Sequence, residues 1–140
     1  MSKKSALIAA LIANCQGREL DARYLGYFEC FNQGLFYEAH DVLEELWLPN
    51  RNGSNGAFYK GLIQLAGAFV HLQKGRLQPA VALLKLAYAN LQKYPAIHER
   101  LAVNDVLGLI GHWRERLETN CATCNPLSAE TAPRLALLEQ

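Results

Sequence analysis

One segment of the chain carries side chains whose types and spacing could do chemistry. His40 and Glu44 lie four residues apart, and Trp47 follows three residues later. Side chains three and four apart are neighbours on a helix, so a base, an acid and an aromatic ring share one stripe. Polar groups on an apolar face cost free energy unless they are bonded. The pattern therefore predicts a site.

The His40–Glu44 pair has three chemical uses, and the sequence leaves all three open. Imidazole nitrogen and carboxylate oxygen could both bind a metal ion. The carboxylate could instead set the tautomer of the imidazole, which would make the two residues a catalytic acid–base pair. The pair could also be a structural hydrogen bond. His40 and Glu44 are therefore the candidate catalytic residues of an unknown reaction.

A second polar stripe lies in the next, otherwise apolar, helical segment. Lys60, Gln64 and His71 recur at offsets of four and seven, which again places them on one helix face. If the two helices are antiparallel neighbours, this stripe can meet the first one. Gly61 and Gly67 would permit close approach, a reason to find glycine in a helix despite its cost of ~1 kcal/mol.

The two stripes together predict a polar pocket between these helices. Lys60 could neutralise an anionic ligand at the pocket mouth. Aromatic side chains such as Tyr37 and Trp47 are more often core than ligand platforms, but both lie beside the stripe. The candidate ligand-binding residues are Tyr37, His40, Glu44, Trp47, Lys60, Gln64 and His71.

A metal ion is the other occupant that this pocket could take. The candidate ligands are His40, Glu44 and His71, which would supply two imidazoles and one carboxylate. Two metal ions are harder to supply, because bundles that hold them use two Glu-x-x-His pairs and two further glutamates. The sequence identifies no cofactor.

The elements that must position these residues are helices, because apolar residues recur at three and four rather than at two. Asp21 can cap one helix and Gly34 end it, Ser54 or Asn55 can cap another that Gly75 ends, and Pro79 suits a first turn. No strand is expected. The predicted helices cover about residues 3–14, 21–33, 35–48 (stopping before Pro49), 56–74, 78–93 and 97–119.

The predicted fold is all-α: a compact single-domain bundle of about five or six helices with short connections. An N-terminal helix or extension (residues 1–20) precedes the bundle domain (21–119), and a C-terminal tail (120–140) that could add one short helix follows it. With 51% hydrophobic and 19% charged residues, a chain of 140 residues can bury a core.

Composition and charge also limit the classes of partner that we expect for this protein. The net charge is +1 and no basic run or interleaving of basic and aromatic residues occurs, so nucleic acid is not expected. No stretch is apolar enough to span a membrane, and residues 1–15 suit a packed helix better than a targeting segment. We therefore expect a cytoplasmic protein, with a homo-oligomer left open.

Cys30 suits a buried thiol. Cys121 and Cys124 form one C-x-x-C, whereas a structural zinc site normally needs four ligands. This pair could be redox-active, could hold a metal ion together with the pair of a second copy of the chain, or could be a coincidence of the tail.

Two stretches of the chain combine several uncommon residue types in a fixed order. They read Phe31-Asn32-x-Gly34-x-Phe36-Tyr37-Glu38-Ala39-His40-x-x-Leu43-Glu44-x-x-Trp47 and Phe58-Tyr59-Lys60-Gly61-Leu62-Ile63-Gln64-x-Ala66-x-Ala68-x-x-His71. Together they resemble the signature of the domain-of-unknown-function 309 family. The resemblance covers about residues 22–95. It implies a compact all-helical bundle and gives weight to His40, Glu44, Trp47, Gln64 and His71, but it implies no reaction.

Two functions follow from these observations. The first is the binding of a small molecule or a metal ion in the polar pocket. The alternative is a helical protein–protein interaction module without catalytic activity, for which the alanine- and leucine-rich stretch 80–87 is suited. The two differ in what they expose, because an interaction module should present a contiguous apolar patch.

Overall fold

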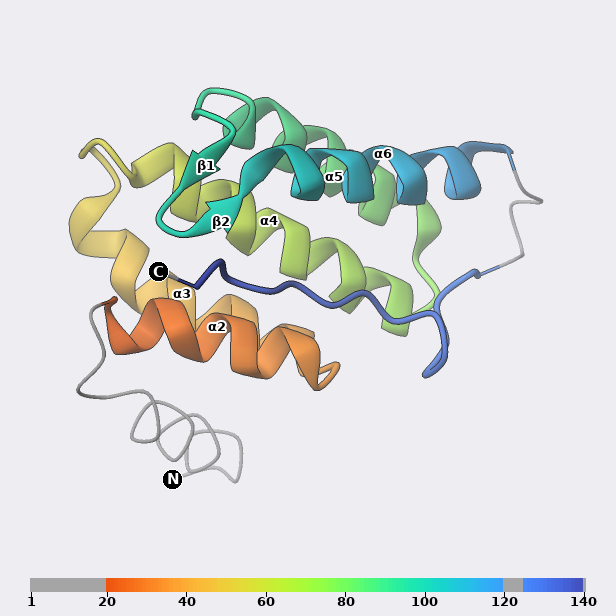
Figure 1. The fold of residues 1–140 in the computed structure, drawn as a ribbon. Helices are drawn as coiled ribbons and strands as arrows, with labels where there is room; N and C mark the ends of the chain where they lie inside the picture. The colour runs from red at the N-terminus through yellow and green to blue at the C-terminus, as the bar shows by residue number, and fades with distance from the viewer. Residues whose placement is uncertain (1–19, 120–124, 140) are drawn as a thin grey trace, which may run out of the picture.

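The chain folds into antiparallel helices joined by short turns. The computed structural model describes residues 20–119 and 125–139. Its elements are α2 (Ala22–Asn32), α3 (Phe36–Asn50), α4 (Gly56–Gln73), α5 (Leu77–Leu91), β1 (Ile97–His98), β2 (Leu101–Ala102) and α6 (Val103–Thr119). Successive helices run in opposite directions, and α4 lies between the α2–α3 pair and the α5–α6 pair (Figure 1). The predicted all-α bundle is confirmed, with five helices in the described residues.

Caps and turns place several helix ends where the sequence predicts them. The Asp21 side chain accepts a hydrogen bond from the Arg23 amide at 2.8 Å, which caps α2. Gly34 (φ 75°) follows α2 and Gly75 (φ 72°) follows α4, both in the left-handed region that glycine enters without a steric cost. Pro79 lies in the first turn of α5.

Helix α3 continues to Asn50, so the prediction that it stops before Pro49 is wrong. A proline in a helix removes the amide that would bond to the carbonyl four residues earlier. Here that carbonyl belongs to Glu45, and it accepts a hydrogen bond from Arg23 Nη1 at 3.3 Å. The guanidinium thus replaces the missing donor, and the last turn of α3 persists.

Residues 97–102 form a β-hairpin, so the prediction of a helix over 97–119 is wrong at its start, as is the expectation of no strand. The two turn residues, Glu99 (φ 49°) and Arg100 (φ 59°), occupy the left-handed region that a two-residue hairpin turn requires. The hydroxyl of Tyr24 on α2 donates to the Glu99 carbonyl at 2.8 Å. This long-range bond helps hold a turn that its own residue types do not favour.

Asn55 precedes α4 as predicted, but its side chain makes no capping hydrogen bond. Its Oδ1 lies 2.7 Å from Nε2 of His98 on β1 instead. The His98 ring also packs edge-to-face on Phe58, with 4.7 Å between the ring centroids. His98 is therefore a packing residue that joins the hairpin to the start of α4.

The segment 125–139 runs extended along the bundle between α2 and α6 (Figure 1). The Asn32 side chain exchanges two hydrogen bonds with the Leu135 backbone, both at 2.7 Å. Leu137 bridges Leu101 of β2, and Leu135 is 6% exposed. The described part of the predicted tail therefore packs on the bundle as an extended segment without a helix; the boundary at residue 120 stays a prediction.

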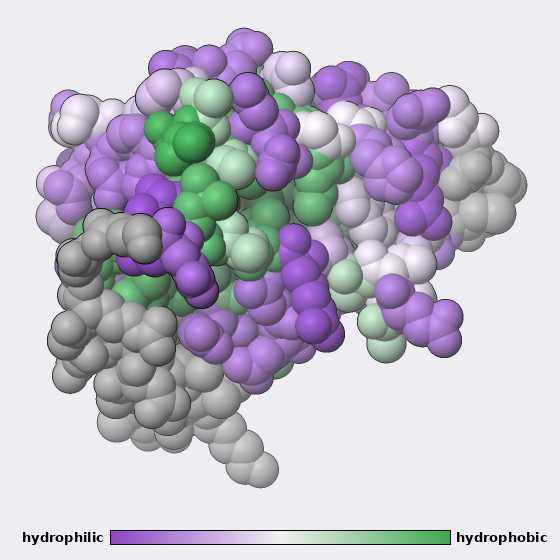
Figure 2. Space-filling view, viewed as in Figure 1, coloured by the Kyte–Doolittle hydropathy of each residue, from purple (hydrophilic) through white to green (hydrophobic). Residues whose placement is uncertain are grey.

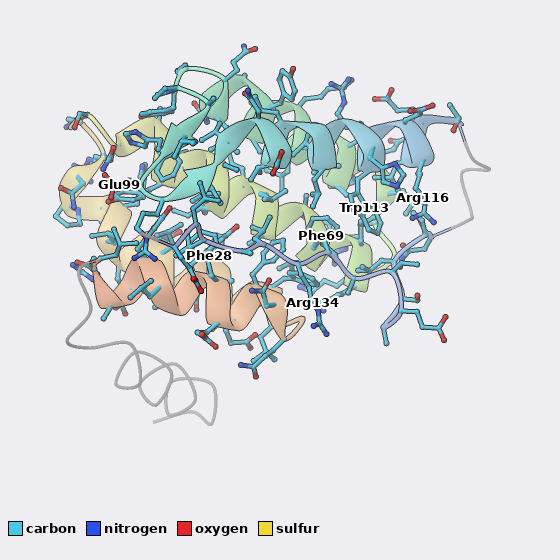
Figure 3. The ribbon with its side chains drawn as sticks, in the orientation of Figure 1. Phe28, Phe69, Glu99, Trp113, Arg116 and Arg134 are labelled. Atoms are coloured by element: carbon cyan, nitrogen blue, oxygen red, sulfur yellow. The ribbon has the colours of Figure 1, made fainter. Side chains whose placement is uncertain are left out.

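Aromatic side chains join the layers of the core. Phe69 on α4 meets Trp113 on α6 edge-to-face, with 5.0 Å between their ring centroids, and the Arg116 guanidinium lies 5.2 Å from the centroid of the Trp113 ring (Figure 3). Tyr27 is completely buried, and its hydroxyl donates to the Leu62 carbonyl at 2.6 Å. Cys30 is buried at 1% exposure, as expected. The contacts tie α2, α4 and α6 into one core.

Apolar side chains on the viewed surface gather over the hairpin and the start of α6 (Figure 2). The most exposed large hydrophobic side chain of the described residues is Ile97 on β1, at 61%. The others of this kind lie on several elements and are Tyr37, Leu48, Leu86, Tyr88 and Leu138. Among the described helices, none has the length and apolar content needed to cross a membrane.

Candidate functional site

A surface pocket of about 330 Å³ is formed by α3, α4 and α5. We call it the α4 pocket, because most of its lining residues belong to α4 and its C-terminal cap. The lining residues are Tyr37, His40, Lys60, Ile63, Gln64, Gly67, Val70, His71, Lys74 and Leu83. Five of the seven candidate ligand-binding residues thus lie around one pocket, whereas Glu44 and Trp47 do not line it.

Helix α4 provides the floor of the pocket, and the helices on either side provide its walls. Lys60, Gln64, Gly67 and His71 follow one another at steps of four, three and four residues, which keeps them on one face. Tyr37 and His40 come from α3, and Leu83 comes from α5. The polar stripe lies in the pocket because α3 and α5 both pack against α4 and leave this face open.

The two helix glycines bring α4 close to α5 rather than to α3, which corrects the packing expected from the sequence. A Cβ atom placed on Gly61 would lie 2.8 Å from Leu91 Cγ and 3.2 Å from Asn90 Cβ. One on Gly67 would lie 3.2 Å from Leu83 Cδ1. Both close approaches are therefore made with α5, and this helix becomes a wall of the pocket that the sequence did not predict.

His40 lies between two carboxylates of its own helix. Its Nε2 is 3.5 Å from Glu44 Oε2, and its Nδ1 is 3.2 Å from Asp41 Oδ1. The imidazole is 32% exposed, and its ring centroid lies 6.0 Å from that of Tyr37. The predicted His40–Glu44 pair thus forms at the edge of the pocket, where the imidazole remains accessible. A catalytic role for the pair stays a prediction.

Trp47 acts on the pocket indirectly. The Lys60 ammonium lies 4.4 Å from the centroid of the Trp47 ring, within the range of a cation–π interaction. This contact restrains a long side chain that would otherwise sample many rotamers. The aromatic residue of the first stripe therefore positions the lysine of the second.

Gln64 is oriented by the neighbouring helix. Asn90 Nδ2 on α5 donates to Gln64 Oε1 at 2.7 Å. With this oxygen engaged, the amide nitrogen of Gln64 is the group that can donate to a ligand. The sequence gives no periodic signal for Asn90, because its relation to Gln64 depends on how α5 packs against α4.

His71 has an unsatisfied ring nitrogen. Its Nδ1 is buried and has no hydrogen-bond partner among the described residues. Burial lowers the pKa of His71 below its ordinary value of 6.5, and the nearby cations Arg76 and Lys74 lower it further. The imidazole is therefore held neutral near pH 7, with a nitrogen that a bound molecule could satisfy.

The charged residues that line the pocket are both lysines. Lys60 and Lys74 contribute two positive charges, and no aspartate or glutamate is among the lining residues. Lys74 was missed in the sequence, although its position three residues after His71 places it on the same helix face. The stripe extends one step further than the three residues first identified.

No group of three or more histidine, cysteine, aspartate or glutamate side chains that could hold a metal ion occurs in residues 20–119 and 125–139. His40, Glu44 and His71 lie within these ranges and do not form such a group. Metal binding by them stays a prediction. Cys121 and Cys124 lie outside the described residues.

Comparisons with known proteins match part of the chain to a family model. The family model described as "Domain of unknown function (DUF309)" matches residues 24–83, which confirms the resemblance over that part of the chain. An uncharacterized protein of Aquifex aeolicus (strain VF5) is 34% identical over 65 residues, 46% of this chain. The matched segment is 20% of the length of that relative, so the chain spans about a fifth of it. No solved structure matches the chain.

Proposed function

We propose that the protein binds a small organic anion in the α4 pocket. The observation that carries the proposal is the chemistry of the lining, which combines two lysines, two imidazoles, a phenol and an amide with no carboxylate. A volume of about 330 Å³ lies in the range of small-molecule sites, which are commonly ~300–1,000 Å³. The proposal covers binding and assigns no reaction.

An anion suits the lining better than a metal ion does. Divalent metal ions take carboxylate, imidazole or thiolate ligands, and the lysines of this pocket would repel a cation. A carboxylate or phosphate would instead meet Lys60 and Lys74, whose ammonium groups donate charge-assisted hydrogen bonds. The ligand's uncharged polar groups would face Gln64 and the unsatisfied Nδ1 of His71.

The test is calorimetric titration with probe pairs that differ in charge. Succinate is paired with succinamide and a nucleoside monophosphate with its nucleoside, and inorganic phosphate is tested as an unpaired anion. We expect at least one anion to bind, its counterpart to bind at least tenfold more weakly, and the affinity to fall as salt is raised. A bound anion should also raise the melting temperature.

Matched variants locate the site. Lys60→Gln and His71→Ala should each lower the affinity for the anion by fivefold or more. Lys93→Gln removes the same charge just after the end of α5, outside the lining, and should change the affinity by less than twofold. If no anion in the panel binds, or if Lys93→Gln weakens binding as much as Lys60→Gln, the proposal is wrong.

A further inference from the structure

The charges of this chain are segregated along its sequence. Residues 46–98 hold six basic side chains and no aspartate or glutamate, whereas the rest of the chain holds eight basic and all 13 acidic residues. This stretch comprises the whole of α4 and α5. The near-zero net charge of the protein therefore conceals a cationic part, which would attract acidic partners.

A second and larger groove involves this cationic part. It has a volume of about 980 Å³ and is formed by the first half of α5 and the last turns of α6. These helices lie side by side in Figure 1. The α5 wall, residues 77–85, is about 12 Å long at 1.5 Å per residue. A segment of two to three helical turns would fit along it.

The groove combines an apolar strip with basic side chains. Leu77, Val81 and Leu117 line it, and each is partly or largely buried against the core. Three basic residues also line it, namely Arg76, Lys85 and Arg114, against one acidic residue, Glu118. A partner that fits this lining has an apolar edge flanked by carboxylates.

Arg114 has hydrogen-bonding capacity to spare. Its Nη2 lies 3.3 Å from Glu118 Oε1, in a pair whose side chains are 32% and 43% exposed. Its Nε is buried and has no hydrogen-bond partner among the described residues. A guanidinium offers five N–H donors in a planar fork that matches a carboxylate. A carboxylate entering the groove could therefore complete the bonding of Arg114.

We propose that the α5–α6 groove binds an acidic, amphipathic segment of a partner protein. The apolar edge of the segment would cover Leu77, Val81 and Leu117, and its carboxylates would pair with Lys85 and Arg114. The lining favours a peptide over a nucleic acid for two reasons. It contains no aromatic side chain on which a base could stack, and its apolar strip would have no partner on a phosphate backbone. This surface shares no lining residue with the α4 pocket.

The test uses three fluorescent 12-residue helical peptides with the same leucine positions and with glutamate, glutamine or lysine at the others. Fluorescence anisotropy with the full chain should show binding of the glutamate peptide only, with an affinity that falls as salt is raised. Lys85→Glu should lower the affinity for the glutamate peptide at least tenfold, because residue 85 would then repel a peptide carboxylate instead of attracting it. Arg114→Gln, combined with Lys85→Glu, should abolish it.

The controls separate the groove from general electrostatics. Lys93→Glu makes the same charge change at an exposed position just after α5 and should weaken the peptide less than threefold. Circular dichroism of each variant tests folding, and the exposed position of Lys85 makes Lys85→Glu the decisive single variant. Lys85→Glu should leave anion binding in the α4 pocket unchanged.

Three outcomes would overturn the proposal. Equal binding of the lysine and glutamate peptides would show that charge does not select the partner. Displacement of the glutamate peptide by a 12-nucleotide single-stranded DNA at equal concentration would point to a nucleic acid. If light scattering shows that the wild type is a dimer and that Lys85→Glu is a monomer, the groove is occupied by a second copy of the chain.

Discussion

Replacing Gly61 with alanine is expected to destabilise the protein, although alanine is the better helix former. Alanine in a helix interior gains ~1 kcal/mol over glycine. The new Cβ would lie 2.8 Å from Leu91 Cγ and 3.0 Å from Leu91 Cδ2, well inside the ~3.5–4.0 Å of a favourable carbon–carbon contact. Leu91 is completely buried, so it has no room to move without shifting α5.

Overpacking of this kind typically costs ~1–3 kcal/mol. Asn90 adds to the cost, because its Cβ would lie 3.2 Å from the new atom and its amide holds Gln64. Subtracting the gain in helix propensity leaves about 0–2 kcal/mol. The close contact with Asn90 favours the upper half of this range, so Gly61→Ala should lose about 1–2 kcal/mol of unfolding free energy. Gly108→Ala is the matched control, since a Cβ added at this exposed position in α6 would have nothing within 4 Å of it.

Urea unfolding followed by far-ultraviolet circular dichroism gives both free energies from the midpoint and slope. Gly108→Ala should gain about 0.5–1 kcal/mol, so the effects of the two alanine substitutions should be opposite in sign and differ by about 1.5–3 kcal/mol. If Gly61→Ala is as stable as Gly108→Ala, then α4 and α5 do not pack as closely as described, and the wall of the α4 pocket is misplaced.

Three further predictions concern single positions. His71 has a pKa lowered by burial and by Arg76 and Lys74, so below about pH 6.5 the unfolded state binds a proton more readily and stability falls. Between pH 7.5 and 5, the melting temperature of His71→Ala should fall by less than that of the wild type. An equal fall in both proteins would contradict the expected role of His71. Leu135→Ala should cost about 2–4 kcal/mol in urea unfolding, because the side chain is 6% exposed, and a cost under about 1 kcal/mol would place it outside the core. Glu99→Asn should gain about 0.5–1 kcal/mol in the same assay, since asparagine tolerates a positive φ better, and a loss would mean that the Glu99 side chain matters more than its backbone.

Local signals in the sequence predict most of the helices. Asp21, Gly34, Gly75 and Pro79 each act within one turn of the helix end that they mark, so their effect is readable without knowledge of the fold. Residues 97–102 could not be read in this way. Their types suit a helix, and the hairpin depends on bonds such as that from Tyr24, which come from distant parts of the chain.

The site was predictable to the extent that it lies on one helix. The stripe of Lys60, Gln64 and His71 needs only the helical period, and these residues do share a pocket. Which helix forms each wall depends on tertiary packing, so Leu83 and Asn90 of α5 were missed. The cytoplasmic location and any role of a homo-oligomer stay predictions.

The path of residues 125–139 has a consequence for the order of folding. These residues are synthesised after every described helix, yet Leu135 fills a place in the core beside Asn32, 103 positions earlier. Helix hairpins form from near neighbours and can assemble early, whereas a contact of such long range closes slowly. A chain still on the ribosome would therefore have assembled helices with an exposed apolar surface where Leu135 later packs. Docking of residues 125–139 on this surface would be the last folding step, and the chain would be most prone to aggregate before it.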